Sequence, residues 1–252
     1  MKKILSLFLF LITIFSVVSL AGCGKNKTET QSAYLELGLG IYSDISNTSD
    51  ATAQENGKGE HTEAVAVVLL DDNKKIVNCF LDTAENVVNY TSQGEFKVAE
   101  SFTSKRQLGD SYNMKQASPI KLEWYQQADA FAKAVKGKTV DEVKALVADN
   151  GKPNRQVITA GCTINISDFV KAIEKAIENA EKIESKAVDS LSVKIETTKG
   201  ECKNATENED GFIELKSVVT ATALSESKQV ESKSEELSIK FTFDKEGKST
   251  TK

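Results

Sequence analysis

The chain has 252 residues, of which 40% are hydrophobic and 27% are charged, and its formal net charge is -5 at pH 7. It is long enough to bury one good core, or one core with a smaller module beside it, and its composition is not that of a disordered chain. Acidic residues outnumber the basic ones, which are dispersed along the chain, so we expect no nucleic-acid partner.

The first residues have the pattern of a bacterial lipoprotein signal. Two lysines precede an apolar run over residues 4–18, and the sequence LAGC closes it at residues 20–23. An ordinary secretory site needs only small residues, whereas this signal needs a thiol that accepts lipid. We expect a signal peptide over residues 1–22, diacylglyceryl and palmitoyl groups on Cys23, and a polar tether over residues 23–33. The protein would then be anchored on the extracytoplasmic face of the cell membrane. A retained single-pass anchor, the alternative, gives the same location.

The next segment has strand-like patterns. Residues 63–71 and 75–82 are rich in β-branched and apolar residues and predict a hairpin, and residues 87–90 predict a further strand. The acidic turn between the first two runs lacks the ligand spacing of a calcium loop, so we expect a plain hairpin turn. His61, the only histidine, lies in a polar stretch, and we expect it to be solvated. A single histidine gives little support to a His-dependent triad or a two-histidine zinc site.

Helical patterns follow the strands. Ser118 and Pro119 predict the start of a helix whose apolar residues recur up to Val135. Thr139 and Glu142 have the spacing of a capping box, for a second helix that continues through Val147. A third helix is expected to start at Ser167 or Asp168 and to bury Phe169, Val170, Ile173, Ile177 and Ala180. We expect a solvated loop at residues 104–112. Strands followed by helices predict an α+β fold, an antiparallel sheet with helices packed on it.

The C-terminal part repeats the strand region. Residues 37–96 align on residues 191–249 almost without gaps, and the shared positions include turn glycines. Such a match at one offset indicates duplication, although chance similarity between two β-rich segments is an alternative. We therefore expect a domain over residues 34–186 and a truncated second copy, its β part only, over residues 187–252. A half-domain of this kind is expected to pack on the first copy or to fold marginally, and its edge strand is one place where a partner could bind.

Three cysteines follow Cys23, namely Cys79, Cys162 and Cys202. An odd number cannot form a complete disulfide framework, so at least one thiol stays free. Cys79 lies in a predicted strand and Cys162 in a loop, and both could face one core. We expect buried free thiols there, with a disulfide or redox pair as the alternative.

The loop TAGCTINISDF, at residues 159–169, precedes the third predicted helix. Together with the repeated hairpin and the stretch at residues 104–143, it resembles bacterial cell-surface lipoproteins with FMN-binding domains. The resemblance covers residues 34–186. Proteins of that family are implicated in extracytoplasmic electron transfer, and a flavin transferase attaches their FMN through its phosphate to a threonine. The resemblance therefore implies a non-enzymatic electron carrier, with a flavin transferase and a membrane electron donor as partners.

The family motif is Asp, two spacers, Ser or Thr, Gly, Ala, Thr. In this chain Gly161 matches the motif glycine and Thr163 the acceptor threonine, whereas Cys162 stands in place of alanine, Ala160 in place of the hydroxyl residue, and Val157 in place of aspartate. The resemblance thus implies FMN held by Gly161, Cys162 and Thr163.

Simple chemistry permits this role. A hydroxyl close to a helix N-terminus puts a phosphate ester where backbone N–H groups favour negative charge. The isoalloxazine needs an aromatic slot, for which the candidates are Trp124, Tyr125 and Tyr112. The alternative is a cofactor-free binding or structural surface lipoprotein, in which Thr163 only satisfies turn hydrogen bonds, and Val157 favours it.

Overall fold

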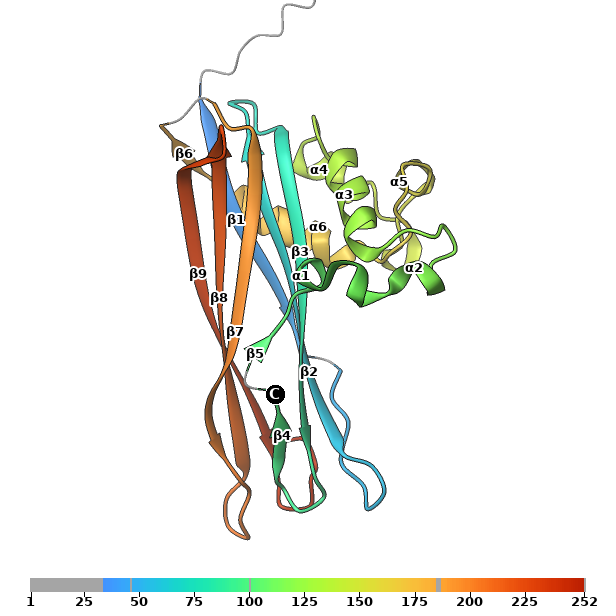
Figure 1. Cartoon of the computed structure of the whole chain (residues 1–252), viewed down its shortest axis with the longest axis vertical. Helices are drawn as coiled ribbons and strands as arrows, with labels where there is room; N and C mark the ends of the chain where they lie inside the picture. Colours follow the sequence, from blue (N-terminus) through green and yellow to red (C-terminus); the bar gives the residue numbers. More distant parts are fainter. Residues whose placement is uncertain (1–33, 46, 100, 185–186, 252) are drawn as a thin grey trace, which may run out of the picture. The chain divides into compact units, whose positions relative to one another are not determined.

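Two antiparallel β-sheets pack face to face in the computed structural model, and helices cover the outer face of the first sheet (Figure 1). The structure describes residues 34–45, 47–99, 101–184 and 187–251. The signal peptide, Cys23 and the tether expected within residues 1–33 lie outside these ranges. The helices and strands, in chain order, are β1 (Leu35–Asp44), β2 (Gly57–Leu70), β3 (Ile76–Tyr90), β4 (Phe96–Val98), β5 (Ser101–Phe102), α1 (Lys105–Leu108), the 3-10 helix η1 (Gly109–Tyr112), α2 (Met114–Ala117), α3 (Trp124–Ala134), α4 (Val140–Lys144), the 3-10 helix η2 (Asp149–Gly151), α5 (Arg155–Thr159), α6 (Ser167–Glu178), β6 (Glu181–Ile183), β7 (Ser190–Lys203), β8 (Gly211–Ser225) and β9 (Lys228–Phe243).

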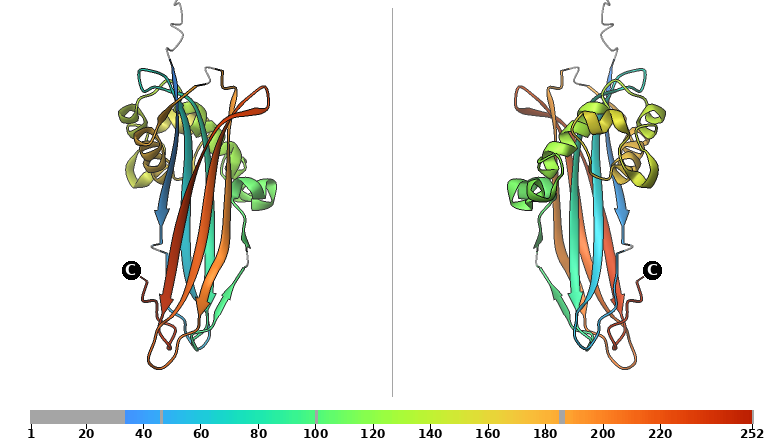
Figure 2. Two further views of the ribbon diagram at one scale, coloured as in Figure 1. Left: turned by 90° about the vertical axis from the view of Figure 1, so that its left-hand side faces the viewer. Right: turned by 90° about the vertical axis from the view of Figure 1, so that its right-hand side faces the viewer.

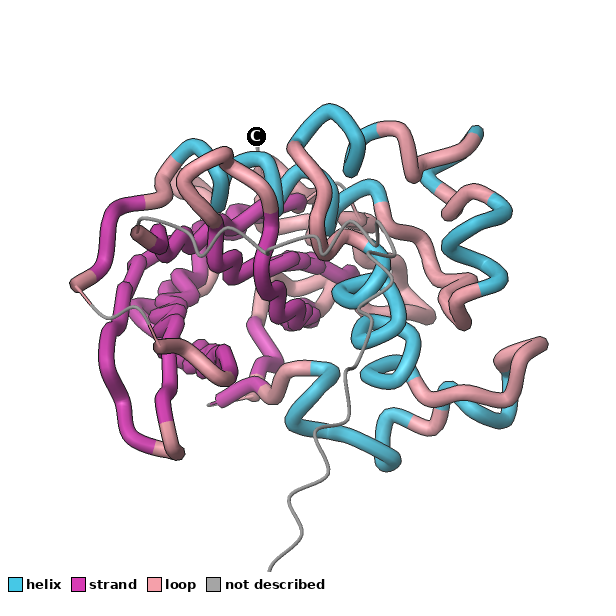
Figure 3. Tube along the Cα trace, turned by 90° about the horizontal axis from the view of Figure 1, so that it is seen from above, coloured by secondary structure: helices cyan, strands magenta, loops and turns pink. Residues whose placement is uncertain are grey.

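The order of the strands is simple. Counted over the described residues, the first sheet has five strands in the order β4-β3-β2-β1-β6, and the second has four in the order β5-β7-β8-β9. Helix α6 contacts β1 and β2, and α3 contacts β3, so both lie on one face of the first sheet (Figures 1 and 3). The protein therefore has the α+β fold that the sequence predicts. In the described ranges, no helix is long and apolar enough to cross a membrane.

Strand β2 is buried on both of its faces. Val65 and Val67 contact the second sheet, whereas Ala66 and Val68 contact the helical layer. Successive side chains of a strand point to opposite faces, so a strand between two layers needs apolar residues at every position. This requirement accounts for the unbroken apolar run at residues 64–70.

The second sheet has only one buried face. In its strand β8, Val219 and Ala221 are buried against the first sheet, while Thr220 and Thr222 are half-buried on the outer face. In the right-hand view of Figure 2 the helices lie in front of the first sheet, and the second sheet lies behind it. Threonine tolerates water and favours strands, so this outer face needs no helical cover.

Residues that the sequence alignment treats as equivalent meet each other across the two sheets. The Ala51 N–H donates to the Gly247 carbonyl at 2.7 Å, and the Ala205 N–H donates to the Gly94 carbonyl at 3.4 Å. The alignment pairs each alanine with the other and each glycine with the other. The two contacts are therefore reciprocal, as an approximate two-fold axis between the copies requires. This reciprocity is compatible with the predicted duplication, which stays a prediction, and the second sheet packs on the first.

The strands agree with the predicted hairpin but are longer. The turn between β2 and β3 is closed by the Asp71 N–H, which donates to the Lys75 carbonyl at 3.0 Å, so the acidic cluster is a hairpin turn as expected. Residues 87–90 are not a separate strand, which corrects the prediction. They continue β3, because its pairing with β2 extends as far as Tyr90 opposite Gly57.

Two of the three predicted helices start near the expected residues. Helix α4 has the Thr139 and Glu142 capping box but ends at Lys144, before Val147, and α6 begins at Ser167. The first prediction is wrong at its start, because α3 begins at Trp124 with Glu123 as its N-cap.

The start of α3 shifts for a local reason. Ser118 instead terminates α2, and Lys121 takes a left-handed conformation with φ of 54°, which a continuous helix from Pro119 excludes.

Residues 104–112 are folded rather than a solvated loop. Ser104 caps α1, and its hydroxyl donates to Asp82 at 2.7 Å in the interior of the first sheet. The Arg106 guanidinium donates to the Leu81 carbonyl and to Asp129. These side chains dock α1 onto β3, a long-range contact that local sequence cannot show.

His61 is fully buried, which corrects the expectation of a solvated side chain. The polar stretch around it belongs to β2, which starts at Gly57, and odd-numbered residues of this strand face the second sheet. Ser43 and Asn86 contact the two ring nitrogens. Partners from neighbouring strands thus make its burial tolerable.

The three described cysteines are free, and Cys79 and Cys162 lie in one apolar core as expected. Burial raises the pKa of the Cys79 thiol to about 12 and that of the Cys162 thiol to about 11. Neither thiol is therefore a ready nucleophile at neutral pH. Cys202 is exposed on β7.

Helix α6 lies directly on β1 because two strand residues have no side chain. A Cβ atom built on Gly40 would lie 2.1 Å from the Ala172 carbonyl oxygen, and one on Gly38 would lie 1.9 Å from that of Ala176. Both obstacles are backbone atoms, which cannot rotate away as a side chain can. The position of α6, and with it the loop that precedes the helix, depends on these glycines.

We expect Gly40→Ala to lower the free energy of unfolding by about 1–3 kcal/mol, because α6 must move away from the sheet. Denaturant unfolding followed by circular dichroism measures the change. Gly200→Ala is the matched control in β7, where the nearest atom to the new Cβ is 3.2 Å away, and its cost should be smaller. Equal costs for the two variants would contradict the close packing of α6.

Candidate functional site

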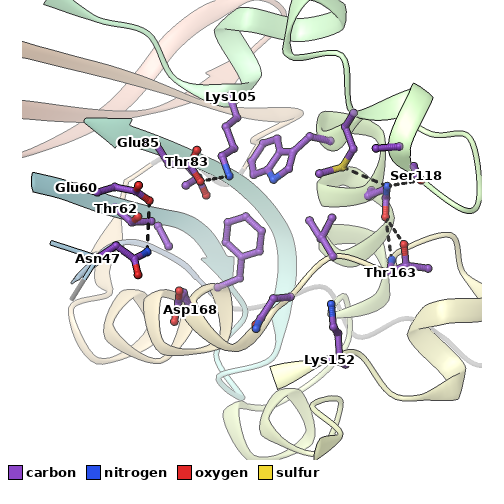
Figure 4. A pocket seen from close by; sticks show the side chains of 18 of the residues that line it. Asn47, Glu60, Thr62, Thr83, Glu85, Lys105, Ser118, Lys152, Thr163 and Asp168 are labelled. Atoms are coloured by element: carbon purple, nitrogen blue, oxygen red, sulfur yellow. Dashed lines mark hydrogen bonds and ion pairs between the residues drawn. The ribbon is translucent and has the colours of Figure 1, made fainter. Parts of the chain in front are cut away.

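A cavity of about 520 Å³ lies between the helices and the outer face of the first sheet (Figure 4). Thr62, Ala64 and Thr83 line it from the sheet, and short side chains at these positions leave the space open. The volume falls in the range of small-molecule sites. Glu60 and Glu85 add to the wall of the sheet, and the remaining walls come from α1, α2, α3, α6 and the loops around them.

Aromatic residues at the start of two helices line the cavity. Trp124 is the first residue of α3, and Phe169 lies in the first turn of α6. Their ring centroids are 5.8 Å apart, with the ring planes tilted, and Met114 also lines this part. These side chains give the cavity a polarisable apolar wall that suits a flat ring system.

The hydroxyl of Thr163 is held by a buried glutamine. Gln127 Oε1 accepts from the Thr163 N–H and from its hydroxyl, both at 2.9 Å. Gln127 Nε2 donates to the Ser118 hydroxyl and the Leu122 carbonyl, both at 3.2 Å. A reversed amide would place NH₂ against the Thr163 N–H and its oxygen against the Leu122 carbonyl, so the orientation of Gln127 is determined. The Thr163 hydroxyl hydrogen therefore points to Gln127.

Two lysines give the cavity positive charge at separate places. Lys105 is mostly buried, pairs with Glu85 and lies 5.8 Å from the centroid of the Trp124 ring. Burial opposes its charge, but hydrogen bonds to Glu85 and Tyr112 outweigh that effect and raise the pKa of Lys105. Lys152 is exposed near Thr163, and its amine forms no ion pair with the described residues (Figure 4). Lys152 is therefore available for an anion.

The structure brings together some of the expected site residues. Thr163 and Trp124 line the same cavity. Cys162 does not, because it is fully buried in the apolar core beneath the loop. Gly161 adopts φ of 102°, which favours glycine, and serves the turn rather than the cavity.

The other expectations for the loop and the aromatic slot are also corrected. Tyr125 and Tyr112 do not line the cavity; Tyr125 instead donates its hydroxyl to Asp110 at 3.1 Å. Thr163 does not sit at the N-terminus of α6. Asn165 accepts the Ser167 N–H there at 2.9 Å, so the first free donor of the helix is already satisfied.

Val157, which stands where the family motif has aspartate, is fully buried in α5. It belongs to the same apolar core as Cys162. An aspartate at this point would be a buried charge, so valine suits the present packing.

Sequence reasoning missed Gln127, Lys105 and Phe169 as cavity residues. The sequence contains an indication of Gln127, because this polar residue lies next to Ala128 on the buried face of α3. A buried polar side chain in a helix needs partners, and such a position often marks a structured site. No local sequence pattern indicates that Lys105 lines the cavity, since its position depends on the docking of α1 onto β3. No cluster of metal-binding side chains occurs among the residues that the structure describes.

Comparison with known proteins gives one distant relative. The chain is 25% identical over 161 residues to a chlorophenol reductase of Desulfitobacterium hafniense, and the match covers 56% of this chain and 48% of the reductase. The chain thus spans about half the length of the curated relative that it matches. No family model matches the chain, and no solved structure matches it.

We expect Gln127→Leu to lower the free energy of unfolding by about 1–3 kcal/mol, because it leaves the Thr163 N–H and hydroxyl without their acceptor. Thr163→Val should cost less, since its N–H bond to Gln127 remains. Denaturant unfolding of both variants and of the double variant measures the coupling. Gln116→Leu, at an exposed position, is the control. Additive costs in the double variant would contradict a direct interaction.

Proposed function

We propose that the protein is a lipid-anchored extracytoplasmic electron carrier that holds FMN in the cavity beside Thr163. The observation that carries the proposal is the position of the Thr163 hydroxyl, which lines a cavity of about 520 Å³ together with Trp124. The site thus combines the aromatic side chain of Trp124 with a threonine hydroxyl that can be esterified. Such a combination suits a flat heteroaromatic group that is attached through a phosphate ester.

The cavity residues fit the parts of FMN. Trp124 and Phe169 offer an aromatic wall for the isoalloxazine, and Lys152 and Thr163 offer a cation and a hydroxyl for the phosphate. Lys105, paired with Glu85, also lies beside the aromatic wall. When bound, FMN would supply reversible electron transfer, and the residues of the chain would orient it and limit its contact with water.

The anchor and the attachment serve the same purpose in this proposal. Outside the cell a cofactor that dissociates is diluted, whereas a covalent ester to Thr163 keeps it at the protein. The lipoprotein signal at residues 1–23 supports a location where membrane electron donors are within reach. A flavin transferase would be the modifying partner.

The distant relative is named for a reduction, since it is called a chlorophenol reductase. This name is compatible with a redox role for the present chain.

A cofactor-free binding lipoprotein is the second candidate. Val157 supports it, because the motif aspartate that a transferase would recognise is replaced by a buried apolar residue. The hydrogen bond from the Thr163 hydroxyl to Gln127 supports it as well, because esterification must break that bond.

The proposal predicts flavin fluorescence that persists on a denaturing gel after co-production with a flavin transferase and supply of FAD. Thr163→Val should abolish the band, because valine has no hydroxyl to esterify. Thr159→Val is the matched control, since Thr159 lies in the same segment but bonds to the Arg155 carbonyl. Absence of both a covalent band and flavin absorption after gentle purification would leave the cofactor-free candidate.

A further inference from the structure

A second group of polar side chains lies between the two sheets, on the opposite face of β2 from the cavity. His61 and Glu63 have no exposed side-chain surface, and both belong to β2. Ser43 of β1 lies opposite Glu63 in the strand register, and its side chain reaches His61. The group is independent of the flavin proposal, because even-numbered residues of β2 line the cavity and odd-numbered residues build this group.

The contacts form a chain from a hydroxyl through an imidazole to a carboxylate. Ser43 Oγ is 2.6 Å from His61 Nε2, and His61 Nδ1 is 3.4 Å from Glu63 Oε1. The second sheet contacts the carboxylate at the end of this chain of contacts, because Ser217 Oγ of β8 donates to Glu63 Oε2 at 2.8 Å. Thr197 donates in turn to Ser217 at 3.0 Å, so the carboxylate is oriented by its own partners.

Two buried acceptors favour a proton on His61 Nδ1. Among the described residues, Glu63 Oε1 and Asn86 Oδ1 have no hydrogen-bond partner, although both residues lie beside His61 Nδ1. A proton on Nδ1 would face Glu63 Oε1, and the 3.4 Å between the two atoms has to shorten for a full hydrogen bond. Reversal of the Asn86 amide, whose Nδ2 is placed 3.2 Å from Nδ1, would bring its oxygen to the same proton. In this tautomer Nε2 is free to accept the proton of Ser43.

We propose that Ser43, His61 and Glu63 form a nucleophilic triad in which Ser43 accepts an acyl or phosphonyl group from an activated ester. The bond formed joins Ser43 Oγ to the acyl carbon or the phosphorus, and the leaving group departs with its electron pair. The serine proton passes to His61 Nε2 and then to the leaving group. Nucleophile, base and orienting carboxylate have the roles that this chemistry requires.

Access to Ser43 is open. The serine is exposed near the end of β1, and β6 pairs with β1 over residues 35–37, so none of the described strands pairs with the edge at Ser43. Reagents can therefore reach the hydroxyl while His61 and Glu63 stay buried.

The reactivity of Ser43 should depend on the ionisation of Glu63. Burial raises the pKa of Glu63 to about 7, and the hydrogen bond from Ser217 opposes this effect. Burial lowers the pKa of His61 to about 4, against the negative charge of Asp44, so the imidazole is neutral above that pH. Below pH 7 a protonated Glu63 donates to Nδ1, and Nε2 then carries the hydrogen and donates to Ser43. Above pH 7 the carboxylate accepts from Nδ1, and Nε2 becomes the base.

Labelling with a fluorophosphonate probe tests the triad in the full chain extracted in detergent, with the modified residue identified by peptide mass spectrometry. We expect label on Ser43, with a rate that rises roughly tenfold from pH 6 to pH 8 as Glu63 ionises. Ser43→Ala should abolish it. Ser234→Ala is the matched control, because Ser234 is an exposed strand serine whose hydroxyl is hydrogen-bonded to that of Thr220 rather than to an imidazole.

Glu63→Gln should make the labelling rate independent of pH in this range, since glutamine does not ionise. This readout separates a catalytic triad from a merely structural network, and thermal unfolding checks that the variant is folded. His61→Gln should reduce the rate to that of Ser234. The proposal is overturned if Ser43 is labelled no faster than Ser234, or if the rate keeps its rise with pH in folded Glu63→Gln.

Discussion

The contact between the inner faces of the two sheets is the interaction on which the rest of the structure depends. Val65 and Val67 of the first sheet are buried with Val219 and Ala221 of the second. Full burial of one such valine contributes about 1.5–3 kcal/mol, so the shared core is a major part of the folding energy. Because the second sheet covers this face, the other face of the first sheet is free to carry the helices and the cavity.

The two sheets thus divide two tasks. The first sheet has apolar residues on both faces and binds helices, whereas the second has threonines on its outer face. The reciprocal bonds of Ala51 and Ala205 join loops of the two sheets. The second sheet also supplies Ser217, which donates a hydrogen bond to Glu63.

Much of the architecture follows from local patterns. The apolar runs predict β2 and β3, the capping box predicts α4, and apolar spacing predicts α6, because each signal lies within a few consecutive residues. The wrong predictions concern residues whose burial or position depends on segments that are distant in the sequence. His61 is buried by the second sheet, and Lys105 is placed by the docking of α1 on β3, so neither position could be inferred from its neighbours. Similarly, the motif predicts Thr163 but not Gln127, whose contact with it joins α3 to a loop 36 residues away.

The candidate site combines a fixed hydroxyl with an aromatic wall, and both depend on helix placement. Gly38 and Gly40 let α6 approach the sheet, which sets the position of Phe169. Gln127 of α3 holds the loop that carries Thr163. A rigid hydroxyl beside an open cavity is the geometry that a tethered cofactor needs, because pre-organisation reduces the cost of ordering it.

The most direct measurement uses the only tryptophan of the chain, which lines the cavity. FMN is titrated into the apoprotein while Trp124 fluorescence is recorded and corrected for absorption by the flavin. The account predicts saturable quenching with one FMN per chain, and weaker binding of riboflavin, which lacks the phosphate that Lys152 would contact. Unchanged Trp124 emission at saturating FMN would contradict a flavin site in this cavity.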